Sequence, residues 1–86
     1  MFYVYILKSK KDSELYIGST NDLKKRIKQH KAGLVRSTKF RNPFILVYYE
    51  AYFSENDARR REQGLKLRGQ ARFHLKNRIN KNLQET

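Results

Sequence analysis

One acidic residue stands inside a strongly basic stretch of this chain. Glu62 is the only acid in the run ARRREQGLKLRGQARFHLKNR, four residues after Ala58 and three before Leu65. On a helix, this spacing places the carboxylate on or near the inward face. A carboxylate near a phosphate site suits Mg²⁺, which prefers hard oxygen ligands and often takes only one or two carboxylates. The alternative is simple charge balance, through i,i+4 pairing with Lys66.

A second pair of polar side chains also has helical spacing. Arg26 and His30 are four residues apart, on a stripe beside Leu23 and Ile27, so both can point at one spot. The planar fork of an arginine binds phosphate, and a histidine can act as a donor or a base near neutral pH. Taken alone, a solvated basic face with a histidine at its boundary is the commoner explanation.

The chain contains six tyrosines, and three of them, Tyr3, Tyr5 and Tyr16, fall in the strand-like segments FYVYIL and LYIGS. Both segments are aromatic and β-branched, and a polar stretch separates them, so they predict a β-hairpin. If the turn is centred between Lys10 and Lys11, Tyr5 and Tyr16 face each other across the hairpin. The alternative is that both are ordinary aromatics at the edge of a core.

A helix is expected after the hairpin, from about Asp22 to Ala32. Either Asn21 or Asp22 can cap its start, and Gly33 can end it. Residues 34–43 have no clear period, and they are interpreted as a basic loop that could lie against phosphates.

The second half of the chain predicts one strand and two helices. The apolar run FILVYYEAY, from Phe44 to Tyr52, is typical of a strand covered on both faces and central in its sheet. Ser54 opens the next helix, with Asp57 completing an approximate capping box. A last helical segment runs roughly from Gln70 to Leu83. The predicted fold is α+β, with a three-stranded mixed or antiparallel sheet flanked by helices in the order ββαβαα, in a single domain.

The composition narrows the possible partners. Lys and Arg number 20 against 8 acidic residues, which gives a formal net charge of +12 for 86 residues. Such a field attracts polyanions, so nucleic acid is the leading partner; a generally basic protein or an anionic-membrane binder is the alternative. The absence of cysteine excludes disulfides, thiolate zinc sites and a cysteine nucleophile. With no apolar run of membrane-spanning length, a soluble, cytoplasmic protein is expected.

Several of these features occur together in one known family. The chain contains, in order, Tyr3-Val4-Tyr5, the elements YIG-x-T, R-x-x-x-H and P-x-x-L-V-Y-Y-E, and A-x-x-x-E. In this it resembles the GIY-YIG nuclease domain, in particular the small standalone branch of UPF0213-like and URI-like proteins. Tyr3 and Val4 stand where the family name has Gly and Ile, a difference that this branch tolerates.

The resemblance implies a mixed three-stranded sheet and one divalent metal, Mg²⁺ or Mn²⁺. By position, Glu62 would ligate the metal, Arg26 would neutralise the scissile phosphate, and Tyr16 would act as or assist the general base on water. Tyr5 and His30 would hold the hydrogen-bonded network. Because a tyrosine has a pKa of about 10, it is a poor base near pH 7 unless its surroundings lower that pKa. The family often has a further asparagine, for which Asn77 and Asn80 are candidates.

The function expected from the resemblance is a metal-dependent endonuclease acting on DNA, with RNA as an open alternative. Gly18 would allow close backbone approach to the site. Phosphate contacts are expected from basic residues, namely Lys24, Lys25, Lys39, Arg41, Arg61, Arg68 and Arg72. The rival interpretations are a non-catalytic nucleic-acid-binding module on the same fold and a protein-interaction role. Both monomer and homodimer are open, since an unpaired sheet edge could support a dimer.

Overall fold

The structure is a computed structural model that describes residues 1–67 of the chain. Its elements are β1 (Phe2–Ser9), β2 (Leu15–Thr20), α1 (Leu23–Lys31), a short 3-10 helix (Lys39–Arg41), β3 (Phe44–Tyr52) and α2 (Glu55–Leu67). The sheet is antiparallel throughout, so the predicted α+β class and the order ββαβα are confirmed. The predicted last helix, Gln70 to Leu83, lies outside the described residues.

The strand order is β2-β1-β3, which places β1 in the centre of the sheet. The prediction that Phe44–Tyr52 is the central strand is therefore wrong. β1 carries the continuously buried run Val4 to Leu7, whereas Leu46 and Tyr49 of β3 are 38% and 54% exposed. An aromatic run can occupy an edge strand because a tyrosine combines an apolar ring with a polar tip that tolerates water.

The hairpin register also differs from the prediction. Tyr5 is opposite Gly18, and Tyr16 is opposite Leu7. The two tyrosines are diagonal neighbours with ring centroids 6.3 Å apart, not direct partners. The turn is centred one residue later than expected, and Ser13 adopts a φ of 61°. The sequence prediction placed the turn at its lysine pair and had no signal for this left-handed residue.

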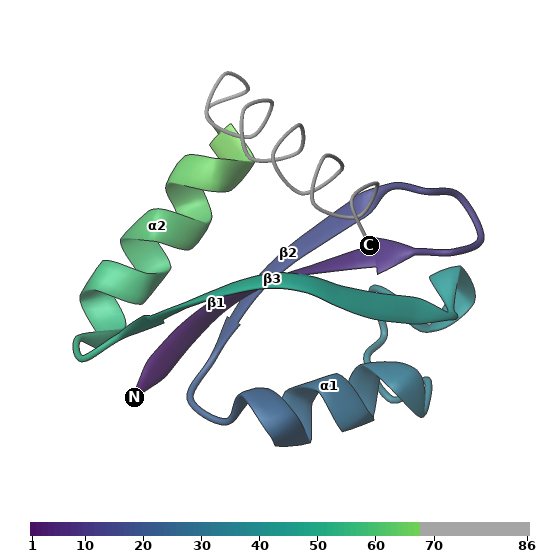
Figure 1. Cartoon of the computed structure of the whole chain (residues 1–86), viewed down its shortest axis with the longest axis horizontal. Coiled ribbons are helices and arrows are strands. Elements are labelled where there is room, and N and C mark those ends of the chain that lie inside the picture. Colours follow the sequence, from purple (N-terminus) through teal and green to yellow (C-terminus); the bar gives the residue numbers. More distant parts are fainter. Residues whose placement is uncertain (68–86) are drawn as a thin grey trace.

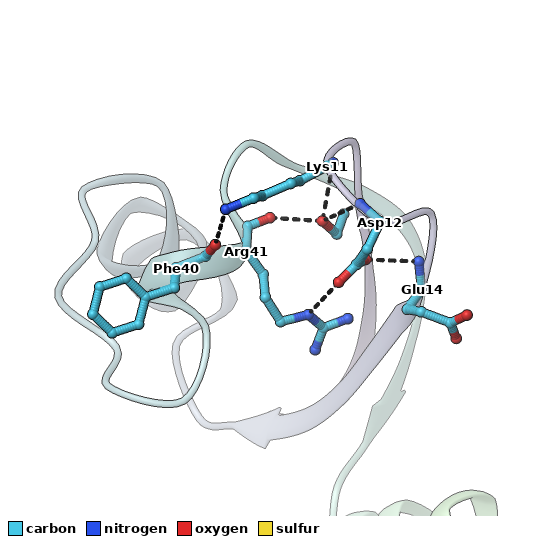
Figure 2. A network of polar contacts seen from close by, with 6 residues as sticks. Lys11, Asp12, Glu14, Phe40 and Arg41 are labelled. Atoms are coloured by element: carbon cyan, nitrogen blue, oxygen red, sulfur yellow. Dashed lines mark hydrogen bonds and ion pairs between the residues drawn. The ribbon is translucent and has the colours of Figure 1, made fainter.

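The hairpin turn is tied to the short 3-10 helix, as Figure 2 shows. Ser9 Oγ donates to the carbonyl of Arg41 at 2.6 Å, and Lys11 Nζ donates to the carbonyl of Phe40 at 3.1 Å. The Arg41 Nε donates to Asp12 Oδ2 at 3.1 Å. The segment predicted as a basic loop is therefore anchored to the hairpin by both backbone and side-chain contacts.

Helices α1 and α2 lie on opposite sides of the sheet (Figure 1). Because side chains alternate along a strand, β1 contributes to both sides. Val4 and Ile6 pack with Ala58 and Leu65 of α2. Tyr5 and Leu7 form the other cluster, against which Leu23 and Ile27 of α1 pack. The sheet thus carries one apolar core and one core that includes a buried phenol.

The helix ends follow the expected capping chemistry. Asp22 Oδ1 accepts the backbone N–H of Lys25 at 3.1 Å, and Gly33 has a φ of 74° just beyond α1. Ser54 Oγ accepts the backbone N–H of Asp57 at 3.3 Å at the start of α2. These caps satisfy amide donors that have no partner inside a helix. None of the helices in residues 1–67 is long and apolar enough to cross a membrane.

Candidate active site

Tyr5 lies at the centre of the candidate site. Its side chain is 1% exposed and crosses over Gly18 on the neighbouring strand. A Cβ added to Gly18 would lie 2.5 Å from the Tyr5 Oη and 2.6 Å from its Cζ. Real Cβ atoms essentially never approach that closely, so the absent side chain at Gly18 is what makes room for the phenol. The role expected for Gly18 in close approach of a ligand stays a prediction.

His30 connects Tyr5 to the loop that follows α1. Its ring is fully buried, with Nε2 2.8 Å from Tyr5 Oη and Nδ1 2.7 Å from Thr38 Oγ1. Burial, with the positive charge of Arg26 as the smaller cause, lowers the pKa of His30 from 6.5 to about 4. The imidazole is therefore neutral at pH 7, and it does not supply the charged donor or near-neutral base that its ordinary pKa would allow.

The hydrogen-bond partners assign the tautomer of this neutral ring. The Thr38 hydroxyl donates to the carbonyl of Val35 at 3.4 Å. With that proton used, Nδ1 of His30 is the donor to Thr38 and Nε2 is the acceptor from Tyr5. Sequence reasoning missed Thr38, because it lies in an aperiodic segment and no spacing rule connects it to His30.

The electrostatic surroundings of Tyr5 bring the remaining candidates together. Burial, the largest cause, raises the pKa of Tyr5 to about 12; Arg26 opposes the shift, while Tyr16 and Glu62 add to it. Tyr5 is therefore a protonated phenol at neutral pH. Three residues from β2, α1 and α2 thus lie within electrostatic reach of one hydroxyl group.

Tyr16 differs from Tyr5 in its access to solvent. It is half-buried, and its ring centroid lies 5.2 Å from that of His30 in an edge-on arrangement. The aromatic cluster fixes the ring, while part of the side chain remains open to water. Of the two tyrosines, Tyr16 is the one that a water molecule or substrate can contact.

Arg26 lines a cleft of about 410 Å³ between α1 and α2, at the edge of β2. It is half-buried, and its Nη1 donates to Gln29 Oε1 at 3.2 Å. The lining residues include Ser19 and Thr20 from β2, Arg26 and Gln29 from α1, and Ala58 and Arg59 from α2. The cleft therefore presents a guanidinium group between the two helices.

Glu62 is joined to this cleft through Ser19. The Ser19 hydroxyl donates to Glu62 Oε1 at 2.8 Å, and Lys66 Nζ lies 2.9 Å from Oε2. The glutamate side chain is 18% exposed, so it is sheltered but reachable. The i,i+4 pair with Lys66 that the sequence allowed is confirmed. Ser19 was not predicted, since its contact depends on how α2 packs against the sheet.

The donor set around Glu62 fits a hard divalent cation with few protein ligands. Among residues 1–67, no three histidine or acidic side chains gather into a metal-binding group. One carboxylate with waters and phosphate oxygens is a common arrangement for Mg²⁺. The Lys66 ammonium already occupies a cation position on Oε2, in a pair whose lysine is 49% exposed. Such surface pairs contribute only about 0–1 kcal/mol, so a divalent ion can replace the ammonium.

The basic residues expected to contact phosphate have different surroundings. Lys24 and Lys25 are exposed on α1, whereas Lys39 packs over the Phe40 ring at 4.8 Å. Arg41 is paired with Asp12 in the network of Figure 2. Four candidates lie outside the described residues, namely Arg68, Arg72, Asn77 and Asn80.

Arg61 takes part in a polar cluster between α2 and β3. Its Nε and Nη2 donate to the two carboxylate oxygens of Glu50, at 2.9 and 3.2 Å. Tyr48 and Tyr52 donate to the same carboxylate at 2.6 and 2.7 Å. Burial alone would raise the pKa of Glu50, but these hydrogen bonds hold it below its usual value. Arg61 thus fastens α2 to the sheet beside Glu62.

Comparison with known proteins agrees with this fold. The family model described as the GIY-YIG catalytic domain matches residues 1–80. The UPF0213 protein CPE1444 of Clostridium perfringens is 48% identical over 67 residues, which cover 77% of this chain and 71% of the relative. The UPF0213 protein SH2523 of Staphylococcus haemolyticus is 46% identical over 65 residues, or 74% and 78% of the two chains.

A solved structure shows the same relationship. The solution NMR structure of the UPF0213 protein BH0048 from Bacillus halodurans has a TM-score of 0.55 and 38% identity, covering 88% of this chain and 84% of that one. The family match and these relatives identify a domain of a nuclease-domain family. The chain belongs to the GIY-YIG family, and its relatives are UPF0213 proteins.

Proposed function

We propose that this protein is a metal-dependent endonuclease that hydrolyses phosphodiester bonds in nucleic acid, with DNA as the expected substrate. The observation that carries the proposal is the convergence on Tyr5. His30 binds its hydroxyl group, and Tyr16, Arg26 and Glu62 all act on its pKa. A purely structural role would not require a phosphate-binding group and a carboxylate at the same buried phenol.

Each residue has a distinct part in the proposed reaction. Arg26 binds the scissile phosphate and neutralises the charge that grows on it in the transition state. Glu62 would hold Mg²⁺ or Mn²⁺ next to the cleft, with Ser19 orienting its carboxylate through their hydrogen bond. When bound there, the metal supplies Lewis-acid polarisation of the phosphoryl oxygen and the leaving group.

Tyr16 is the proposed acceptor, direct or assisted, of the proton from the attacking water. The water oxygen forms a bond to phosphorus as the bond between phosphorus and the 3′ oxygen breaks, and the 3′ oxygen takes up a proton from solvent water. The products are a 5′-phosphate and a 3′-hydroxyl group. Tyr5 cannot take the role of Tyr16, because its raised pKa keeps it protonated and its proton is donated to His30.

The supporting chain from Tyr5 through His30 to Thr38 has a positioning role. Its distances of 2.8 and 2.7 Å hold the phenol in place beside Gly18 of β2. Neither group changes its protonation state near pH 7, since the pKa of Tyr5 is about 12 and that of His30 about 4. Proton transfer is thereby left to groups that reach solvent.

The test is cleavage of labelled single-stranded, duplex and branched DNA, and of RNA, with Mg²⁺ or Mn²⁺ against EDTA. The wild type should cut at least one substrate in the presence of metal only, and Glu62→Gln should not. Arg60→Gln, an exposed change on the same helix, is the matched control and should leave cleavage intact. If wild type binds every substrate and cuts none, the non-catalytic binding module replaces this proposal.

A further inference from the structure

A second groove runs along the other flank of α1, between this helix and the edge strand β3. Its volume is about 540 Å³. The floor is formed by Tyr3 of β1 with Leu46 and Tyr49 of β3, and the rim by Lys24, Lys28 and Lys31 of α1. The groove and the candidate active-site cleft share only Asn21 and Asp22, at the start of α1. The two hollows therefore meet around the N-terminal end of one helix.

The floor of this groove offers an aromatic ring to solvent. Tyr49 is 54% exposed, and Leu46 beside it is 38% exposed. The Tyr3 ring lies edge-on to Tyr49, with centroids 6.2 Å apart and planes at 64°. The edge contact fixes the orientation of Tyr49 without covering it, because only one part of its ring faces Tyr3. A planar apolar group can stack on what remains exposed.

The rim of the groove is positively charged. Lys24, Lys28 and Lys31 follow the i, i+4, i+7 spacing of a single helix face, and all three are exposed. Within residues 1–67, none of their side-chain ammonium groups takes part in a hydrogen bond or ion pair. The single acid in the lining is Asp22, whose Oδ1 accepts the backbone N–H of Lys25. The groove thus combines unpaired cations with an aromatic floor.

We infer that this groove binds a single-stranded segment of nucleic acid. An unpaired base stacks on Tyr49, and the flanking phosphates contact the three rim lysines. A base in a duplex is stacked on both sides and cannot offer its face to the floor of a groove, whereas successive bases of a single strand can. The inference rests on the proposed function for its partner class and adds a site outside the catalytic cleft.

The position of the groove lets one nucleic-acid strand run from the cleft into the groove. A strand that leaves the Arg26 cleft at Asn21 and Asp22 passes the start of α1 and enters the groove beside Lys24. The substrate class that fits both hollows is accordingly a nucleic acid with an unpaired stretch next to the scissile bond.

The first test measures binding of a fluorescent oligothymidylate in EDTA, where no cleavage can occur. Tyr49→Ala should weaken binding about fivefold or more, the loss typical of one stacked base, and Tyr49→Phe should restore it. Phe53→Ala removes another exposed aromatic, which is 91% exposed and outside the groove, and should change nothing. An abasic strand of the same length should not distinguish wild type from Tyr49→Ala. Equal binding of oligothymidylate by wild type and Tyr49→Ala would overturn the inference.

The second test separates the groove from general charge. In the triple variant, Lys24, Lys28 and Lys31 are changed to Gln. Each phosphate contact contributes about 0.7 to the slope of log affinity against log salt concentration for a single strand, so the loss of three contacts should reduce this slope by about 2. A charge-matched control changes Lys10, Arg36 and Arg60 to Gln, all exposed and outside the groove. An equal loss in both variants would contradict the groove. The Glu62→Gln variant tests cleavage separately. If the wild type cuts no substrate but Tyr49→Ala still weakens single-strand binding, the nuclease proposal is wrong and the inference about the groove holds.

Discussion

Gly18 and Tyr5 are direct partners in the β1–β2 hairpin, and the phenol occupies the space that a side chain at Gly18 would fill. The family motif YIG therefore has a packing explanation in this chain. The glycine on β2 is required by the tyrosine on β1, whose hydroxyl group then reaches His30. The steric fit alone, without any substrate, therefore couples two residues that are thirteen positions apart in the sequence.

Gly18→Ala should displace Tyr5 and weaken both folding and cleavage. The added methyl group would lie 2.5 Å from the Tyr5 Oη, so the phenol must move and lose its contact with His30. Overpacking of this kind costs about 1–3 kcal/mol. Urea denaturation of both proteins measures the loss.

Gly64→Ala is the matched control for that substitution. Gly64 lies within α2, and a Cβ there has no atom within 4 Å. Alanine in a helix is more favourable than glycine by about 0.5–1 kcal/mol, so this variant should be more stable than wild type. A Gly18→Ala protein as stable as Gly64→Ala would refute the steric argument.

The buried His30 should make the fold sensitive to acid. Its pKa is about 4 in the native state and near 6.5 when unfolded, so between these values the unfolded chain binds more protons. Stability contributed by the neutral ring is present above pH 6.5 and is lost as the pH falls towards 4, by about 3 kcal/mol. Thermal unfolding between pH 7 and pH 4 measures the slope. His30→Gln keeps hydrogen-bonding groups without titrating, and its curve should be flatter in this window.

The fold was largely predictable because its elements depend on local signals. The caps at Asp22 and Ser54 and the bounds of Phe44–Tyr52 follow from residue type and periodicity. The hairpin register was not predictable in the same way, since a turn with Ser13 at a φ of 61° shifts every cross-strand pair. A central position for Phe44–Tyr52 failed because tyrosine-rich runs suit edges as well as interiors.

The candidate site also has one part that sequence spacing predicts and another part that depends on packing. Arg26 and His30 share a helix, and Glu62 and Lys66 share another, so spacing alone relates the members of each pair. Thr38 reaches His30 from the aperiodic segment after α1, and Ser19 reaches Glu62 because α2 packs against the sheet; no spacing rule describes either contact. The second partners of the histidine and the glutamate thus required the three-dimensional structure.

Lys66→Gln should strengthen metal binding at Glu62. The ammonium 2.9 Å from Oε2 competes with a divalent ion for the same oxygen, and its removal also eliminates a local repulsion. Isothermal titration with Mn²⁺ should show a several-fold tighter dissociation constant, consistent with about 1 kcal/mol for an exposed pair. Arg60→Gln removes one charge from the same helix without touching Glu62 and should have a smaller effect. Weaker binding by Lys66→Gln would mean that the metal does not use this oxygen.

Arg61→Gln distinguishes a structural role from a phosphate contact. Arg61 donates hydrogen bonds to both oxygens of the Glu50 carboxylate, which also accepts hydrogen bonds from Tyr48 and Tyr52. Loss of the guanidinium leaves a sheltered carboxylate without its cation, which costs about 1–3 kcal/mol. The substitution also removes a contact that holds α2 against the sheet next to Glu62. The variant should therefore unfold at a lower urea concentration and cleave more slowly. A variant of unchanged stability whose DNA affinity falls with a smaller salt slope would instead assign Arg61 to the phosphates.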